Sequence, residues 1–201
     1  MVHHAETAGI HLGNSSKEAP MKKALLSVLI LFPLLLCGCG DRAAVSRFEA
    51  FSGDLAAREA LSYTAQLRAE YPDRSVEFTL AYQKGAEGEA VTVLAPERIA
   101  GIRARLQPGN AALVYEGLIL DLGPLDAYGL TPMSALPRLT DTLASGAVDS
   151  HWEEDGLRVY RLILDDHLSA TVWFSEAMVP VRAELASDDN VCIFCELSDW
   201  S

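Results

Sequence analysis

Strict alternation of apolar and polar residues is the dominant pattern of the chain after residue 60. It is clearest in Leu61–Tyr71, where every second side chain is apolar, and it returns in Val76–Tyr82. Successive side chains of a strand point to opposite faces, so this alternation indicates strands with one dry and one solvated face. Pro72 and Asp73 between the two stretches indicate a turn and hence a long hairpin.

Further strands are predicted along most of the remaining chain. Each is short, partly apolar and bounded by residues that favour turns. The predicted strands are Ala90–Leu94, Ile102–Leu106, one or two within 111–122 broken near Gly117, and then 151–152, 157–164, 170–175, 181–186 and 191–197. Short connections favour antiparallel pairing, and roughly eleven strands in one small domain must curl into a barrel or half-barrel.

A first helix is predicted before the strands begin. Apolar residues there recur three or four positions apart, which is the spacing of one helix face: Val45, Phe48, Phe51 and Leu55. A short tether, residues 39–44, precedes this helix. We expect residues 45–201 to form one domain, because about 160 residues suffice to bury a single core.

A second helix interrupts the strands. Thr131 suits the N-cap, Pro132 the first helical position and Gly146 the end of the helix. The apolar positions between them have helical spacing: Met133, Leu136, Leu139 and Leu143. Pro137 is a weak point that favours a later start, because proline lacks the amide hydrogen. The whole pattern predicts a mainly β (α+β) fold, a curved antiparallel half-barrel of about eleven strands with two or three helices on its concave face.

The segment before this domain is of a different kind. Lys22 and Lys23 precede an uncharged apolar run, Ala24–Leu36, which is too short to cross a hydrocarbon core of roughly 30 Å. This arrangement is typical of a secretory signal peptide, here residues 21–38, with an uncleaved membrane anchor as the alternative. Residues 1–20 have no hydrophobic periodicity, and we expect an untranslated leader or a disordered extension.

The end of this segment, Leu36 to Cys39, resembles the lipobox of bacterial lipoproteins. The resemblance implies that Cys39 receives lipid, because the small Gly38 precedes it, whereas Cys37 follows the bulky Leu36. The expected location is the extracytoplasmic face of the cell membrane, held by acyl chains such as palmitate. The formal net charge of −12 excludes nucleic-acid binding by counterion release and opposes contact with anionic headgroups, so the acyl chains must supply the anchorage.

Several short phrases of the predicted domain resemble LolA-like lipoproteins of the Lol lipoprotein-carrier superfamily. They are Val93–Glu97 with Ile99–Ala104, Val114–Leu118, Gly129–Pro132 with Ala135–Pro137, and Pro180–Glu184. The resemblance covers about residues 45–200. It implies an eleven-stranded half-barrel closed by helices over an apolar cavity that carries a lipid or the acyl chain of a lipoprotein. The soluble carrier of that system is not lipidated, so an anchored chain is closer to its receptor partner or to neither.

The candidate ligand-binding residues are apolar side chains that share strand faces. They are Tyr63, Ala65, Leu67, Phe78, Leu80 and Tyr82, with Leu94, Tyr115 and Val172 as later candidates. The alternative is that they form an ordinary core beneath the helices. The protein would then be a non-catalytic structural or protein-interaction lipoprotein, with exposed aromatic residues such as Trp200 available to a protein partner.

No catalytic motif is apparent, and we expect neither an enzyme nor a cofactor or metal. Cys192 and Cys195 form a C-x-x-C pattern, but within a strand they point to opposite faces, which favours buried thiols over a redox pair. The histidines of the domain, His151 and His167, are not spaced with the cysteines for zinc. The acidic stretches at 165–167 and 188–190 are expected to be solvated turns, with calcium binding as the alternative.

Overall fold

The structure, a computed structural model, describes residues 39–107, 110–123, 130–188 and 190–201. The expected leader, residues 1–20, and the expected signal peptide, residues 21–38, lie outside the described residues. The chain divides into two compact units, residues 1–43 and 44–201. No helix within the described ranges is long and apolar enough to span a membrane.

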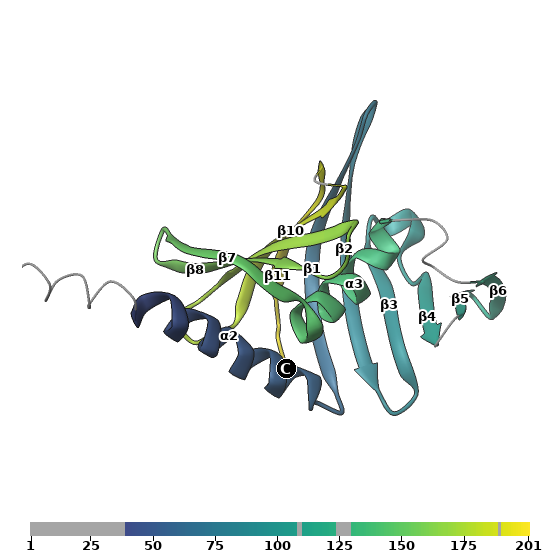
Figure 1. The fold of residues 1–201 in the computed structure, drawn as a ribbon. Helices are drawn as coiled ribbons and strands as arrows, with labels where there is room; N and C mark the ends of the chain where they lie inside the picture. Colours follow the sequence, from purple (N-terminus) through teal and green to yellow (C-terminus); the bar gives the residue numbers. More distant parts are fainter. Residues whose placement is uncertain (1–38, 108–109, 124–129, 189) are drawn as a thin grey trace, which may run out of the picture. The chain divides into compact units, whose positions relative to one another are not determined.

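One antiparallel sheet of eleven strands is the framework of the second unit (Figure 1). Its hydrogen-bonded order is β6-β5-β4-β3-β2-β1-β11-β10-β9-β8-β7, so two meanders meet where β1 pairs with β11. The sheet is open, with β6 and β7 as its edges, which confirms the predicted half-barrel class. The strands are β1 (Leu61–Tyr71), β2 (Arg74–Gly85), β3 (Gly88–Ala95), β4 (Arg103–Gln107), β5 (Asn110–Tyr115), β6 (Leu118–Gly123), β7 (Ala147–Glu154), β8 (Leu157–Ile163), β9 (Leu168–Phe174), β10 (Pro180–Ser187) and β11 (Asn190–Ser198).

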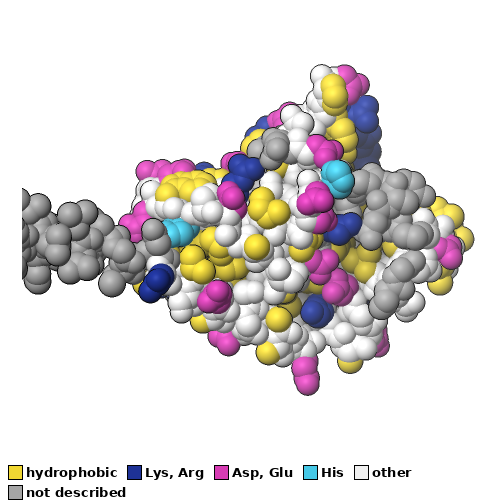
Figure 2. All heavy atoms as spheres, in the orientation of Figure 1, with side chains coloured by type: hydrophobic (Ala, Val, Ile, Leu, Met, Phe, Trp, Pro, Cys, Tyr) yellow, Lys and Arg dark blue, Asp and Glu magenta, His cyan; other side chains and the backbone are white. Residues whose placement is uncertain are grey.

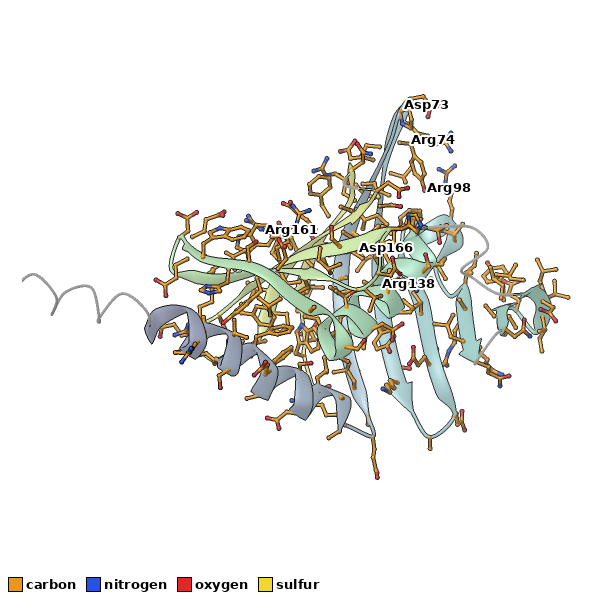
Figure 3. The ribbon with its side chains drawn as sticks, in the orientation of Figure 1. Asp73, Arg74, Arg98, Arg138, Arg161 and Asp166 are labelled. Carbon is orange, nitrogen blue, oxygen red and sulfur yellow. The ribbon has the colours of Figure 1, made fainter. Side chains whose placement is uncertain are left out.

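The alternation of buried and exposed residues in β1 shows which face of the sheet is buried. Leu61, Tyr63, Ala65, Leu67 and Ala69 are all buried, and the residues between them are half-buried or exposed. The face that carries these five side chains is called the inner face, and the opposite one the outer face. The first hairpin is long, and Figure 3 shows its tip projecting from the rest of the sheet.

The edge strand β7 is longer than the prediction of residues 151–152. It runs from Ala147 to Glu154, and most of its residues are exposed. An edge strand next to solvent needs no regular apolar face, so the pattern that reveals the other strands is missing here.

Helix α3 (Pro132–Ser145) starts where its capping residues predict. The Thr131 hydroxyl accepts from the Ser134 backbone N–H at 3.2 Å, and the Ser134 hydroxyl accepts from the Thr131 N–H at 2.8 Å. This reciprocal pair is a capping box. The expectation that Pro137 delays the start is wrong, because the helix begins five residues earlier and includes it. The packed inner face of the sheet holds the helix in place despite the missing hydrogen bond.

Helix α3 lies on the inner face, and so does the part of the preceding helix that belongs to the second unit. Helix α3 contacts β1, β2 and β3 on one side and β8, β9 and β10 on the other. Helix α2 (Cys39–Ala56) begins at Cys39, so the residues expected as a tether are helical, and it buries Phe48 and Leu55. A short 3-10 turn, Glu97–Ile99, connects β3 to β4. Sheet and helices share one hydrophobic core.

Candidate ligand-binding face

Two rows of side chains cross the inner face of the β1–β6 meander. The register of the strands places each row on one line perpendicular to them, so that its members are neighbours across strands. The first row is Tyr63, Tyr82, Val91, Ala104, Leu113 and Leu120. The second contains Ala65, Leu80 and Val93, continues past Ile102, whose carbonyl accepts from the Val93 N–H at 2.8 Å, and ends with Tyr115 and Leu118.

Burial falls steadily along both rows. At the centre, Tyr82, Val91 and Ala104 are fully buried; at β5, Leu113 and Tyr115 are half-buried. At β6 the aliphatic side chains are exposed, Leu120 by 61% and Leu118 by 75%. Figure 1 shows the reason, since α3 crosses the centre of the sheet while β5 and β6 lie beyond it. The inner face therefore stays apolar where the helix no longer covers it.

The predicted ligand-binding residues are brought together on this inner face, with one exception. A third row joins Phe78, Leu67 and, through Cys195 and Ala183, Val172. Leu94 differs, because it lies at a bulge between β2 and β3 and is 48% exposed. The residues that sequence reasoning missed are Leu106, Leu113, Leu118 and Leu120. Only the pairing of β4, β5 and β6 reveals that they continue the same face.

The centre of the inner face is closed by packing and by a hydrogen bond to α3. The Tyr63 hydroxyl donates to the Leu136 carbonyl at 2.9 Å and lies 2.9 Å from the Thr140 hydroxyl. Trp200 stacks on the Tyr63 ring with centroids 4.4 Å apart, so the expectation of an exposed Trp200 is wrong. It is half-buried because the chain after β11 pairs with the start of β1, where Ser201 N donates to Ser62 O at 3.0 Å.

Tyr82 lies beside Tyr63, with ring centroids 5.0 Å apart. Its hydroxyl is buried without a well-formed hydrogen bond to any described residue, although Thr140 and Glu89 lie near it. Burial raises the pKa of both tyrosines well above the ordinary value, so both hydroxyls stay protonated. The central region is therefore a neutral, filled core.

Neither cysteine of the last strand is poised for redox chemistry. Both are free thiols, with Cys195 buried on the inner face and Cys192 half-buried. Burial raises the pKa of Cys195 to about 12 and also raises that of Cys192. Reactive cysteines need the opposite shift, toward the thiolate. This arrangement agrees with the interpretation of buried thiols.

A cavity of about 690 Å³ lies on the outer face of the central strands. Seven of its thirteen lining residues are charged or polar, and five of these carry charges, including Arg68, Glu77, Glu184 and Glu196. The Arg68 guanidinium lies 4.4 Å from the centre of the Phe194 ring. Such a lining suits solvent better than an acyl chain, because burying these groups against hydrocarbon would remove their hydration.

The acidic turns meet at one end of the sheet. His167 Nδ1 lies 2.7 Å from Asp188 Oδ1, and the Asp165 carboxylate accepts from the His167 and Leu168 N–H groups at 2.8 Å. These backbone bonds are those of a solvated turn. Within the described ranges, no group of three or more His, Cys, Asp or Glu side chains is placed to hold a metal ion.

The His167–Asp188 pair predicts a measurable pH dependence. The hydrogen bond to Asp188 raises the pKa of His167, so we expect Asp188→Asn to lower that pKa toward the ordinary value near 6.5. Because the folded pKa is the higher one, any stabilisation is complete below the unfolded pKa and is lost as pH rises through the folded pKa. NMR titration of the imidazole measures the shift, and an unchanged pKa in Asp188→Asn would contradict the pairing.

Comparisons with known proteins concern the fold. No protein-family model and no curated protein sequence matches this chain. Solved structures similar to it include a LolA superfamily protein from Nitrosomonas europaea (TM-score 0.47, 11% identity, covering 78% of this chain and 92% of that one). They also include a DUF1329 family protein from Desulfovibrio piger (TM-score 0.45, 10% identity, covering 80% of this chain and 90% of that one). A third is lipoprotein LppX from Mycobacterium tuberculosis (TM-score 0.36, 14% identity, covering 80% of this chain and 96% of that one). The LolA superfamily, to which the sequence shows a resemblance, is thus among the structures similar to this chain, and at these identities the similarity is one of fold alone.

Proposed function

We propose that this chain is an extracytoplasmic lipoprotein, anchored through lipid on Cys39, that binds an acyl chain on its inner face without catalysis. The binding region is the uncovered part of that face on β4, β5 and β6. What supports the proposal is the decrease of burial along the two apolar rows, from Ala104 to Leu120 and from Val93 to Leu118. A soluble domain exposes a continuous apolar strip of this kind mainly where something binds.

The size of the strip suits a linear apolar chain. Strands lie about 4.8 Å apart, so the two spacings from β4 to β6 cover roughly 10 Å, the length of about eight carbons of an extended chain. Each buried CH₂ contributes about 0.8 kcal/mol, so burying about eight of them contributes about 6 kcal/mol before the entropic cost of binding. No charged partner is needed for this interaction, which agrees with the acidic balance of the chain.

The filled centre favours a second candidate, a structural or protein-interaction lipoprotein. Six of the nine predicted ligand residues are no more than 2% exposed, namely Tyr63, Ala65, Leu67, Leu80, Tyr82 and Val172. An acyl chain could enter that region only if α3 moved. The two candidates differ in whether the β4–β6 end of the inner face takes up lipid.

Variants of two neighbouring residues on β5 test the acyl-chain proposal. Leu113 and Val114 are both half-buried, and they lie on opposite faces of the sheet. We expect residues 40–201 to bind cis-parinaric acid, a fluorescent fatty acid, and Leu113→Glu to weaken binding at least tenfold by placing a charge in the strip. Val114→Glu is the matched control and should bind within threefold of the unsubstituted protein. Binding that is equal in all three, or absent in all three, would reject this site.

The anchor is tested separately in bacterial cells. We expect Cys39→Ala to move the protein from the membrane fraction to the soluble fraction, because an acidic domain is repelled by anionic headgroups and the acyl chains supply its anchorage. Cys37→Ala, two residues earlier, should leave the protein in the membrane fraction. Membrane association that survives Cys39→Ala, or is lost in Cys37→Ala, would assign the anchor elsewhere.

A further inference from the structure

Three consecutive large apolar side chains are exposed on the edge strand β6. They are Leu118, Ile119 and Leu120, with exposed fractions of 75%, 69% and 61%. Ile119 lies on the outer face beside Val114, whereas its two neighbours lie on the inner face. Figure 2 shows hydrophobic side chains gathered at this end of the sheet. The edge is therefore apolar on both of its faces.

The opposite edge of the same sheet has a different character. Strand β7 carries Asp149 and Glu153 as exposed side chains, and Glu154 at its end. Charged residues on an edge prevent pairing with other strands. Strand β6 has one acidic residue, Asp121, near its end. The sheet thus has one edge protected by charge and one that can accept another strand.

The backbone of β6 is also available for pairing. Tyr115 and Leu118 face each other across a two-residue turn, Glu116 and Gly117, whose φ angles of 47° and 84° are those of a tight hairpin. Pairs alternate in an antiparallel ladder between hydrogen-bonded and non-hydrogen-bonded. Because the pair that closes this turn is hydrogen-bonded, Ile119 directs its N–H and C=O away from β5, toward the open edge.

We propose that β6 pairs antiparallel with β6 of a second copy of this chain, centred on Ile119. The sequence Leu-Ile-Leu is symmetric about that residue, so Leu118 of each copy faces Leu120 of the other. All three side chains then gain apolar cross-strand neighbours on both faces, and the backbone groups of Ile119 are satisfied. The same strand is used by both copies, which gives a closed twofold dimer.

Two other occupants of this edge are conceivable, strand β7 of another copy and a lipid surface, and charge favours the pairing of β6 with β6 over both. With Ile119 at the centre, Asp121 faces Gly117 of the second copy, so no like charges are opposed. Pairing of β6 with β7 of another copy would bring Asp121 next to the acidic side chains of β7. It would also leave one free edge on each copy, so that further copies add and a filament forms. A lipid surface would leave the open backbone edge without hydrogen-bond partners and would bury Glu116 at the hairpin tip.

The interface is small. One strand edge with three apolar side chains falls well short of the roughly 800 Å² per partner of a standard interface. We therefore expect a dissociation constant of about 1–100 μM rather than a permanent dimer. The inference rests on the backbone edge and on Ile119 of the outer face, and it shares Leu118 and Leu120 with the proposed acyl-chain strip.

Sedimentation equilibrium of residues 40–201 over 1–500 μM tests the dimer, since residues 44–201 hold the whole core. Ile119→Lys places two like charges opposite each other at the twofold axis and should weaken association at least tenfold. Val179→Lys is the matched control, because Val179 is 40% exposed in the turn between β9 and β10, and it should dimerise normally. Circular dichroism checks that both variants are folded.

Cysteine variants test the register and remain decisive if Ile119→Lys fails to fold. Residues opposite each other in a hydrogen-bonded pair have Cα atoms about 5.5 Å apart, within disulfide range. Under diamide oxidation, Ile119→Cys should form a cross-linked dimer, whereas Leu118→Cys, which faces Leu120, should not. The proposal is overturned by a protein that is monomeric at 500 μM, by a dimer that Ile119→Lys leaves intact, or by a monomer that binds phosphatidylcholine vesicles through β6.

Discussion

Phe174→Ala is expected to lower the free energy of unfolding by about 3–5 kcal/mol. Phe174 is fully buried, and its ring makes edge contacts with three other rings, Phe51 at 5.1 Å, Tyr160 at 5.6 Å and Phe48 at 6.2 Å. Two of these rings come from α2 and one from β8. Truncation therefore removes buried area and leaves a cavity where α2 packs against the sheet.

Urea unfolding of residues 40–201 measures this loss. Thermal unfolding gives a second measure of the same loss. Each kcal/mol lowers the melting temperature of a domain of this size by about 2–4 °C, so the melting temperature should fall by roughly 10 °C. Tyr71→Ala is the control, since Tyr71 is an exposed aromatic residue at the end of β1 and should cost less than about 1 kcal/mol. Similar losses in the two variants would contradict the aromatic cluster as the attachment of α2.

Tyr63→Phe is expected to destabilise the domain by about 1–2 kcal/mol, through α3 in particular. The hydroxyl is a polar link between β1 and α3, since it donates to the Leu136 carbonyl and contacts the Thr140 hydroxyl. Its removal leaves the ring in place but takes away a buried hydrogen bond. Thr140 still donates to the same carbonyl at 3.0 Å, which limits the loss.

Tyr82→Phe is the matched control for this prediction. Tyr82 is equally buried on the same row, but its hydroxyl lacks a well-formed hydrogen bond to any described residue. Its removal should be neutral or slightly stabilising, because a buried polar group without a partner is unfavourable. Hydrogen exchange should show faster exchange of α3 amides in Tyr63→Phe only. Equal exchange in both variants would mean that the hydroxyl does not hold the helix.

Much of the fold can be predicted because the local signals and the packing agree. Strand β1 has the bounds that its alternation predicts, and α3 begins directly after its capping residue, Thr131. Pairing of β1 with β11 is another matter, since it brings together residues far apart in the sequence. No local pattern encodes that contact, and it is the one that joins the two meanders into a single sheet.

The sequence predicts which face of the sheet carries the candidate site, but not how much of that face is uncovered. Alternation places Tyr63 and Tyr82 on one face, yet it does not reveal that α3 covers this part of the sheet and fills it. Conversely, Leu118, Ile119 and Leu120 form a continuous apolar run without alternation, which in sequence is typical of a buried strand. Only the sheet order shows that this run is an edge, open to solvent on both faces.

Native mass spectrometry of residues 40–201, purified from a bacterial cytoplasm, tests the central claim most directly. The account predicts discrete added masses that match a fatty acid or phospholipid, dissociate on activation, and are lost in Leu113→Glu but retained in Val114→Glu. A clean mass of the polypeptide alone, unchanged after incubation with a bacterial lipid extract, would contradict acyl-chain binding and favour the interaction lipoprotein with a filled core.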